Sequence, residues 1–170
     1  TTIINSAIDG NNSTITNSSS TKSNAVMFEF SGNDTGGVGI DHLECSLDGT
    51  SFSACTSPVQ FTSANLLDGT HSFMVIAQDK VGNMMTTPVL FNWTVDTLPP
   101  TTAINTAIDG NNGTLVSGNS TMSTSMSFTF SGNDRGLENN GVGIKQIECS
   151  IDNSNFTACV SPIEFRNQNE

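Results

Sequence analysis

The chain has 170 residues, and only five Lys and Arg residues stand against 16 Asp and Glu residues, which leaves a formal net charge of −11. This balance excludes a nucleic-acid-binding surface, because phosphate binding requires clustered Lys and Arg side chains, and it argues equally against anionic membranes. No run of about 18 apolar residues could form a transmembrane helix, and the first residues lack the basic and apolar parts of a signal peptide. We therefore expect the segment to lie inside a longer protein.

The sequence contains a long internal repeat. TTIINSAIDGNN at the start returns as TTAINTAIDGNN 100 residues later, and the match continues through FEFSGND and FTFSGND, where RGLENN lengthens the next loop of the second copy. One copy is about 100 residues, an ordinary size for an independent domain. We predict a first domain over residues 1–96, a Pro-rich linker over 97–100, and a C-terminally incomplete second domain over 101–170. The second copy has no counterpart of residues 66–95, so we expect the missing strands to come from a continuing chain or from another subunit.

Strand patterns follow one another along the first copy. Val26, Phe28 and Phe30 alternate with residues of the opposite face, and such a period of two is typical of strands with one buried side. The same alternation predicts inward positions for His71, Phe73, Val75 and Ala77. Turn signals such as SGNDTGG, LDGTS and DKVGN separate the patterns. We predict an all-β fold of tandem immunoglobulin-like or fibronectin-III-like β-sandwiches. The first copy is expected to have strands near residues 2–7, 25–31, 39–47, 52–56, 59–62, 71–78 and 89–95, and the second copy to lack the last two.

The four cysteines form two pairs with identical spacing, Cys45 with Cys55 and Cys149 with Cys159. A hairpin that turns at residues 48–51 would bring the first pair opposite each other, at a distance that suits a disulfide. Zinc would need closer spacing and further ligands, and a catalytic thiol would need a companion base. We therefore predict two disulfides and an oxidising, extracellular location at a cell surface.

Three stretches carry a family resemblance: ECSLDGTSFSACTSP, LLDGTHSFMVIAQDKVGN and FNWTVDTLPP follow one another in this order. Together they resemble the tandem bacterial and archaeal Ig-like repeats of large secreted and surface-anchored proteins. The resemblance covers the whole first copy and the first two thirds of the second. It implies a carrier that spaces other modules or builds an adhesive stalk, since such domains are mostly carriers.

Acidic residues in the predicted loops allow two interpretations. Asp34 and Asp79 are expected at one pole of the first sandwich, where carboxylate and carbonyl oxygens could bind calcium. The repeat extends this possible calcium set to Asp96, Asp134 and Glu138. The other interpretation is that Asp and Asn favour turns because their side chains cap backbone amides. The two IDGNN stretches lack the further acidic residues of a calcium loop and predict turns.

Glycosylation is a further possibility for an extracellular chain. The acceptor pattern occurs modestly more often than chance predicts, and nearly all matches lie in predicted loops. The candidates are Asn11, Asn12, Asn17, Asn33, Asn92, Asn112, Asn119 and Asn155.

The sequence predicts a structural function and no enzymatic activity. No Ser/His/Asp arrangement and no glycine-rich phosphate loop is found, whereas two prolines in VDTLPP predict a stiff joint between similar domains. We expect a spacer, stalk or fibre-forming segment of an adhesive surface protein, with no cofactor other than calcium. Alternatives are a ligand- or glycan-binding module that uses the pole loops, and an accessory spacer of an extracellular enzyme. Expected partners are further repeats, neighbouring copies in a fibre, or a surface glycan or protein; nucleic acid and membrane insertion are not expected.

Overall fold

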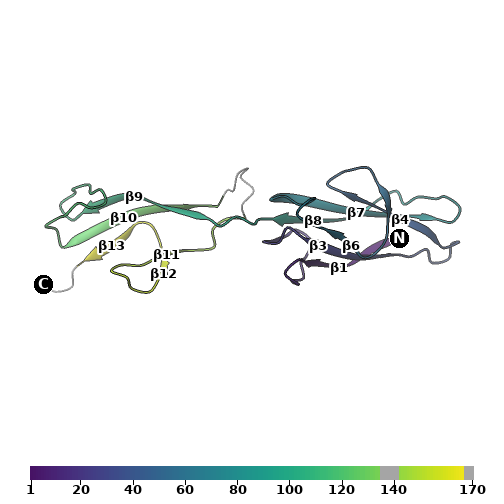
Figure 1. Cartoon of the computed structure of the whole chain (residues 1–170), viewed down its shortest axis with the longest axis horizontal. Helices are drawn as coiled ribbons and strands as arrows, with labels where there is room; N and C mark the ends of the chain where they lie inside the picture. The colour runs from purple at the N-terminus through teal and green to yellow at the C-terminus, as the bar shows by residue number, and fades with distance from the viewer. Residues whose placement is uncertain (135–141, 167–170) are drawn as a thin grey trace. The chain divides into compact units, whose positions relative to one another are not determined.

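The computed structural model describes residues 1–134 and 142–166 (Figure 1). These residues form strands, and no membrane-crossing helix is found among them. The chain divides into two compact units with a boundary between Leu98 and Pro99. We call Thr1–Leu98 unit 1 and the described residues 99–134 and 143–166 unit 2. The strands of unit 1 are β1 (Thr2–Asp9), β2 (Ser19–Thr21), β3 (Val26–Gly32), β4 (Ile40–Leu47), β5 (Ser53–Cys55), β6 (Val59–Phe61), β7 (Gly69–Asp79) and β8 (Val89–Val95).

Unit 1 is a β-sandwich of two sheets. One sheet has the strand order β1-β3-β6 and the other has the order β2-β8-β7-β4-β5. Figure 1 shows these sheets as two layers of unit 1. Neighbouring strands are antiparallel, except that β2 runs parallel to β8. The chain changes sheets between β1 and β2, so the first segment of the unit joins both layers.

An aromatic cluster fills the space between the two sheets. The inward residues of β3 include Phe28, whose side chain is fully buried. Its ring stacks on Phe73 of β7 at a centroid distance of 4.4 Å and meets Trp93 of β8 edge-on at 5.2 Å. Phe61 of β6 and Phe91 of β8 lie 6.3 Å and 5.3 Å from the same ring. Strands β7 and β8 thus supply most of the aromatic surface that covers β3.

Unit 2 reproduces part of this sandwich. Its strands are β9 (Thr101–Asp109), β10 (Ser125–Asn133), β11 (Ile147–Cys149), β12 (Thr157–Cys159) and β13 (Ile163–Arg166). They form a three-stranded sheet of order β13-β10-β9 and a two-stranded sheet of β11 and β12. Phe128 lies opposite Ala107, just as Phe28 lies opposite Ala7 in unit 1. Among the described residues of unit 2, no strand corresponds to β7 or β8.

The predicted all-β sandwich is confirmed, and each of the seven strands expected in the first copy is present. The additional strand β2 was not predicted, because its three residues Ser19–Thr21 carry no apolar alternation. The inward positions expected in β7 are correct, since His71, Phe73, Val75 and Ala77 are all buried, although Ile76 on the opposite face is buried as well.

Candidate functional site

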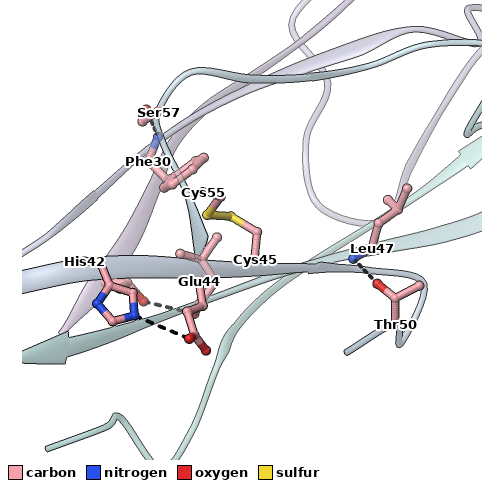
Figure 2. The surroundings of a disulfide bond; sticks show 10 residues. Phe30, His42, Glu44, Cys45, Leu47, Thr50, Cys55 and Ser57 are labelled. Atoms are coloured by element: carbon pink, nitrogen blue, oxygen red, sulfur yellow. Dashed lines mark hydrogen bonds and ion pairs between the residues drawn. A yellow bond between two sulfur atoms is a disulfide. The ribbon is translucent and has the colours of Figure 1, made fainter. Parts of the chain in front are cut away.

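Each repeat carries one disulfide. Cys45 is bonded to Cys55 with a Cα separation of 5.8 Å, and Cys149 is bonded to Cys159 with a separation of 5.9 Å. Figure 2 shows the first bond linking β4 to β5 beside the ring of Phe30. Both predicted disulfides are confirmed. They indicate that the chain matures in an oxidising compartment.

The expected alignment of the paired cysteines is wrong by two positions. In the β4–β5 hairpin, Cys45 lies opposite Ser53, so the disulfide runs diagonally across the ladder. The hairpin turns at Asp48 and Gly49, which have positive φ angles of 51° and 73°, and the β5 side contains one residue more than a two-residue turn requires. An Asp-Gly pair suits such a two-residue hairpin turn. The second repeat has the same diagonal arrangement.

The same five-residue turn occurs three times, at Asp9–Ser13, Asp79–Asn83 and Asp109–Gly113; we call it the Asp turn. In each copy Oδ1 of the first residue accepts hydrogen bonds from the backbone N–H groups of the third and fifth residues, at 2.8–3.0 Å. The backbone N–H of the Asp donates to the carbonyl of the fifth residue at 2.9–3.0 Å. The prediction that both IDGNN stretches form turns is therefore confirmed.

The fourth position of the Asp turn requires a left-handed backbone. The φ angle there is 61° at Asn12, 92° at Gly82 and 63° at Asn112. Gly adopts this conformation without steric cost, and Asn tolerates it better than most residues. The residue types of DGNN and DKVGN are thus explained by backbone geometry.

The second carboxylate oxygen also has a donor in every Asp turn. Oδ2 of Asp9 accepts from Thr21 at 2.5 Å, that of Asp109 from Thr121 at 2.6 Å, and that of Asp79 from Asn83 at 2.7 Å. Burial raises the pKa of Asp9, but the hydrogen bonds from Thr21 and the turn amides together hold the pKa below its ordinary value. The side-chain hydrogen bond from Asn83 likewise lowers the pKa of Asp79. These carboxylates are structural parts of their turns.

Two of the residues in the calcium prediction lie in neighbouring loops of unit 1. Gly39 links them: its N–H donates to Asp34 Oδ2 at 2.9 Å, and its carbonyl accepts from the N–H of Lys80, which follows Asp79. The expectation that these loops share a pole is thus met. However, the described residues contain no group of three His, Cys, Asp or Glu side chains that could hold a metal ion.

The other members of the possible calcium set lie elsewhere. Asp96 follows β8, and its N–H donates to the carbonyl of Thr21 at 2.9 Å. Asp134 follows β10 in unit 2, and Glu138 lies outside the described residues. Calcium binding stays a prediction. The hydrogen bonds of Asp79 favour the alternative interpretation, in which acidic residues cap turns.

A buried histidine of β7 is hydrogen-bonded to the β4–β5 turn. His71 is 8% exposed, and its ring lies against Trp93 at a centroid distance of 5.4 Å. Nδ1 is 2.8 Å from Asp48 Oδ2, and Nε2 is 2.7 Å from the carbonyl of Leu67. Asp48 Oδ1 also accepts from the N–H of Ser72 at 2.7 Å. The sequence pattern predicted the inward position of this histidine but not its polar partners.

The second histidine, His42 on β4, contacts two carboxylates, and Figure 2 shows the contact with Glu44. Nδ1 lies 2.8 Å from Asp41 Oδ2 and Nε2 lies 3.3 Å from Glu44 Oε1. The hydrogen bond to Asp41, followed by that to Glu44, raises the pKa of His42. These contacts favour the protonated imidazolium form of His42. Their contribution to the folding stability is therefore greatest at low pH and declines as the pH rises through the raised pKa.

The glycosylation candidates lie mainly at the surface. All are exposed except Asn92, which is half-buried beside the buried Trp93. Two have side-chain bonds: Asn33 Oδ1 accepts from Thr35 at 2.6 Å, and Asn17 Oδ1 accepts from the N–H of Asn92 at 2.7 Å. Their accessibility is compatible with modification, which stays a prediction.

A parallel strand pair connects the first and last segments of unit 1. In this pair, Ser19 lies opposite Trp93 and Thr21 lies opposite Val95. The ladder is extended at both ends by backbone bonds, from Ser18 N–H to the carbonyl of Asn92 at 2.7 Å and from the N–H of Asp96 to the carbonyl of Thr21. Backbone hydrogen bonds thus join the segment that follows β1 to the last strand of unit 1.

Unit 2 has an open apolar groove of about 490 Å³ between its two sheets. The groove lies where β7 and β8 fill the sandwich in unit 1. Its lining includes Phe128, Phe130, Ile147, Phe156, Ile163 and Phe165.

Comparison with models of known protein families finds no match, and comparison with curated proteins also finds none. The functional interpretation therefore rests on the geometry of the two units.

Proposed function

We propose that the chain is a structural spacer: a load-bearing stalk segment, built from Ig-like repeats, of an extracellular surface protein. Three features support this proposal. Part of the strand arrangement of unit 1 recurs in unit 2, each repeat is crosslinked by its own disulfide, and two prolines lie next to the boundary between the units. A stalk built from such units becomes longer as units are added.

The observation that carries the proposal is the parallel pairing of β2 with β8. A stalk under tension is pulled at the beginning and the end of each unit. In a parallel pair, the force enters at the start of one strand and leaves at the end of the other, so the evenly spaced hydrogen bonds are loaded together. Antiparallel strands pulled apart at one end would instead lose their bonds one after another.

Single-molecule pulling of the oxidised chain by its two ends tests this proposal. We expect unit 1 to unfold in one event at a distinct force, since forced unfolding is governed by the unfolding barrier. The Cys45–Cys55 bond locks a sequence separation of 10 residues across a Cα distance of 5.8 Å. Reduction should therefore lengthen the step by about 3 nm, which is the extended length at about 3.5 Å per residue less the distance that the bond already spans. That added length identifies the event as unfolding of the disulfide-bonded unit.

A matched pair of variants tests the role of the parallel strands. Asn17→Ala removes the acceptor for the N–H of Asn92 and should lower the unfolding force. Asn24→Ala, which alters an exposed side chain between β2 and β3, should leave the force unchanged. Gradual extension without a force peak, or equal forces for both variants, would contradict the load-bearing proposal.

The extracellular part of the proposal has its own test. Native material should contain both disulfides, so its non-reduced mass should be about 4 Da below the fully reduced mass, because each disulfide removes two hydrogens. Free thiols in native material would contradict the assignment of the compartment.

A further inference from the structure

The chain that leaves unit 1 is held to that unit beyond the end of β8. The last residue of β8, Val95, lies opposite Gly69 of β7 on one side and opposite Thr21 of β2 on the other. One residue later, the N–H of Asp96 still donates to the carbonyl of Thr21 at 2.9 Å. The β2 side of the sheet therefore holds the backbone as far as Asp96.

A side chain continues the ladder on the β7 side. Asp68 directly precedes Gly69, and its Oδ1 accepts hydrogen bonds from the N–H of Thr97 at 3.0 Å and from the hydroxyl of Thr97 at 2.8 Å. In an antiparallel pair, the residue before Gly69 lies beside the residues that follow Val95. The carboxylate thus takes the place of a main-chain acceptor, and the backbone is held to unit 1 as far as Thr97.

The pairing of unit 2 begins shortly after this point. Thr101 is the first residue of β9 and lies opposite Asn133 of β10. Its hydroxyl also donates to the carbonyl of Asn133 at 3.3 Å. Residues 98–100, which are Leu-Pro-Pro, therefore separate the last residue held by unit 1 from the first residue held by unit 2.

These three residues have little torsional freedom of their own. The proline rings fix the φ angles of Pro99 and Pro100 at about −65°. Leu98 and Pro99 each precede a proline, which confines both to extended conformations. An ordinary residue added to this segment would therefore contribute a large share of its bending. Thr97 is the neighbouring residue that would do so, and the bonds to Asp68 remove it from the segment.

We propose that Asp68 is a positioning residue for the joint: by holding Thr97 it limits how far the exit segment of unit 1 can bend. The inference rests on the proposed spacer function, because stiffness at a joint serves a chain whose task is to maintain length. The two prolines alone would leave Thr97 free to rotate. The prolines together with Asp68 leave Leu98 as the single residue with a variable φ angle between the two anchors. This role belongs to the acceptor oxygen of Asp68 and not to its charge.

The test measures the distance distribution between spin labels on the two units of the oxidised chain by double electron–electron resonance. The labels are attached at Asn24→Cys and Thr106→Cys, two exposed positions, and the native cysteines do not react because all four are in disulfides. Asp68→Ala should widen the distribution. The r.m.s. span of a flexible segment grows with the square root of its length, so four residues in place of three should widen it by at least about 15%.

Further variants separate the acceptor oxygen from charge and from general stability. Asp68→Asn keeps an acceptor oxygen at the same position and should give the width of the wild type. Asp41→Ala removes an exposed carboxylate of β4 that contacts His42, and it should also give the width of the wild type. If Trp93 fluorescence shows that Asp68→Ala unfolds unit 1, Thr97→Val supplies a second variant. It removes the hydroxyl donor but keeps the N–H donor, so we expect an intermediate width.

Equal widths for the wild type and Asp68→Ala would overturn the proposal. If Asp68→Asn widens the distribution as much as Asp68→Ala does, the effect comes from the charge; if Asp41→Ala does so, it comes from a general loosening of unit 1. Either result would overturn the proposal as well. These outcomes are independent of the pulling experiment, because every variant keeps the residues of the parallel β2–β8 pair. A missing force peak together with the predicted widths would overturn the load-bearing function alone.

Discussion

The stability of unit 1 should depend strongly on one side chain, Phe28. It is fully buried at the centre of the sandwich, and its ring contacts the rings of Phe61, Phe73, Phe91 and Trp93 at centroid distances from 4.4 to 6.3 Å. These partners come from β6, β7 and β8, so both sheets contribute. Phe28→Ala removes one ring from each of these contacts and leaves the backbone pairing of β3 unchanged.

The expected loss can be derived from burial and packing. Truncation of a buried Phe to Ala costs about 3–5 kcal/mol, because the apolar surface is lost and a cavity remains. Aromatic pairs add about 0.5–1.5 kcal/mol beyond burial, which places Phe28→Ala in the upper part of that range, at about 4 kcal/mol. With an m-value of about 1.5 kcal/mol/M in urea, the midpoint of unfolding should fall by about 2.7 M.

The chain provides a specific probe for this measurement. Trp93 is the single tryptophan and is 1% exposed in unit 1, so its fluorescence during urea unfolding, which we call the tryptophan signal, reports unit 1. Phe128→Ala is the matched control: its side chain belongs to unit 2, and we expect an unchanged midpoint. A shift of less than about 1 M for Phe28→Ala, or an equal shift for Phe128→Ala, would refute the packing argument.

The remaining predictions use the same tryptophan signal. Replacing Cys45 and Cys55 together by Ser should lower the stability of unit 1 by about 2–3 kcal/mol, whereas replacing Cys149 and Cys159 should leave its midpoint unchanged; equal effects would contradict separate crosslinking of the units. Asp9→Asn removes a buried acceptor for Thr21 and should cost about 1.5–3 kcal/mol, and no change would contradict the structural role of its carboxylate. Because the folded pKa of Asp9 is lowered, this contribution is fully present above its ordinary pKa of about 3.9 and is lost as the pH falls through the folded value. The difference between wild type and Asp9→Asn should therefore shrink in acid, and a constant difference would contradict that coupling.

Local patterns predicted most of the fold. The alternation around Phe28 and the turn signals placed seven strands, and the DGNN and DKVGN stretches predicted turns at all three Asp turns. Such features depend on residues that are close in sequence. Strand β2 was missed because Ser19–Thr21 carries no apolar alternation, and its partner β8 begins about 70 residues later, at Val89.

Polar contacts across the fold could not be predicted in the same way. His71 occupies an inward position of a regular alternation, yet its partner Asp48 lies 23 residues earlier, in the turn of another strand pair. The diagonal disulfide could be predicted only in part: the Asp48-Gly49 pair favours a two-residue turn, which by itself would place Cys45 opposite Phe52. The observed partner is Ser53, so one further residue lies on the β5 side of the hairpin.

Equivalent residues of the two repeats can differ in burial even where the sequences are nearly identical. Phe28 and Phe128 lie in nearly identical stretches and have the same partners on β1 and β9, yet only Phe28 is fully buried. The difference arises from β7 and β8, which cover one residue and have no counterpart beside the other among the described residues. Strand formation and turn geometry are thus local, whereas closing the sandwich requires surface from a distant segment. Closing the sandwich of unit 2 would therefore take a segment with the pattern of β7 and β8.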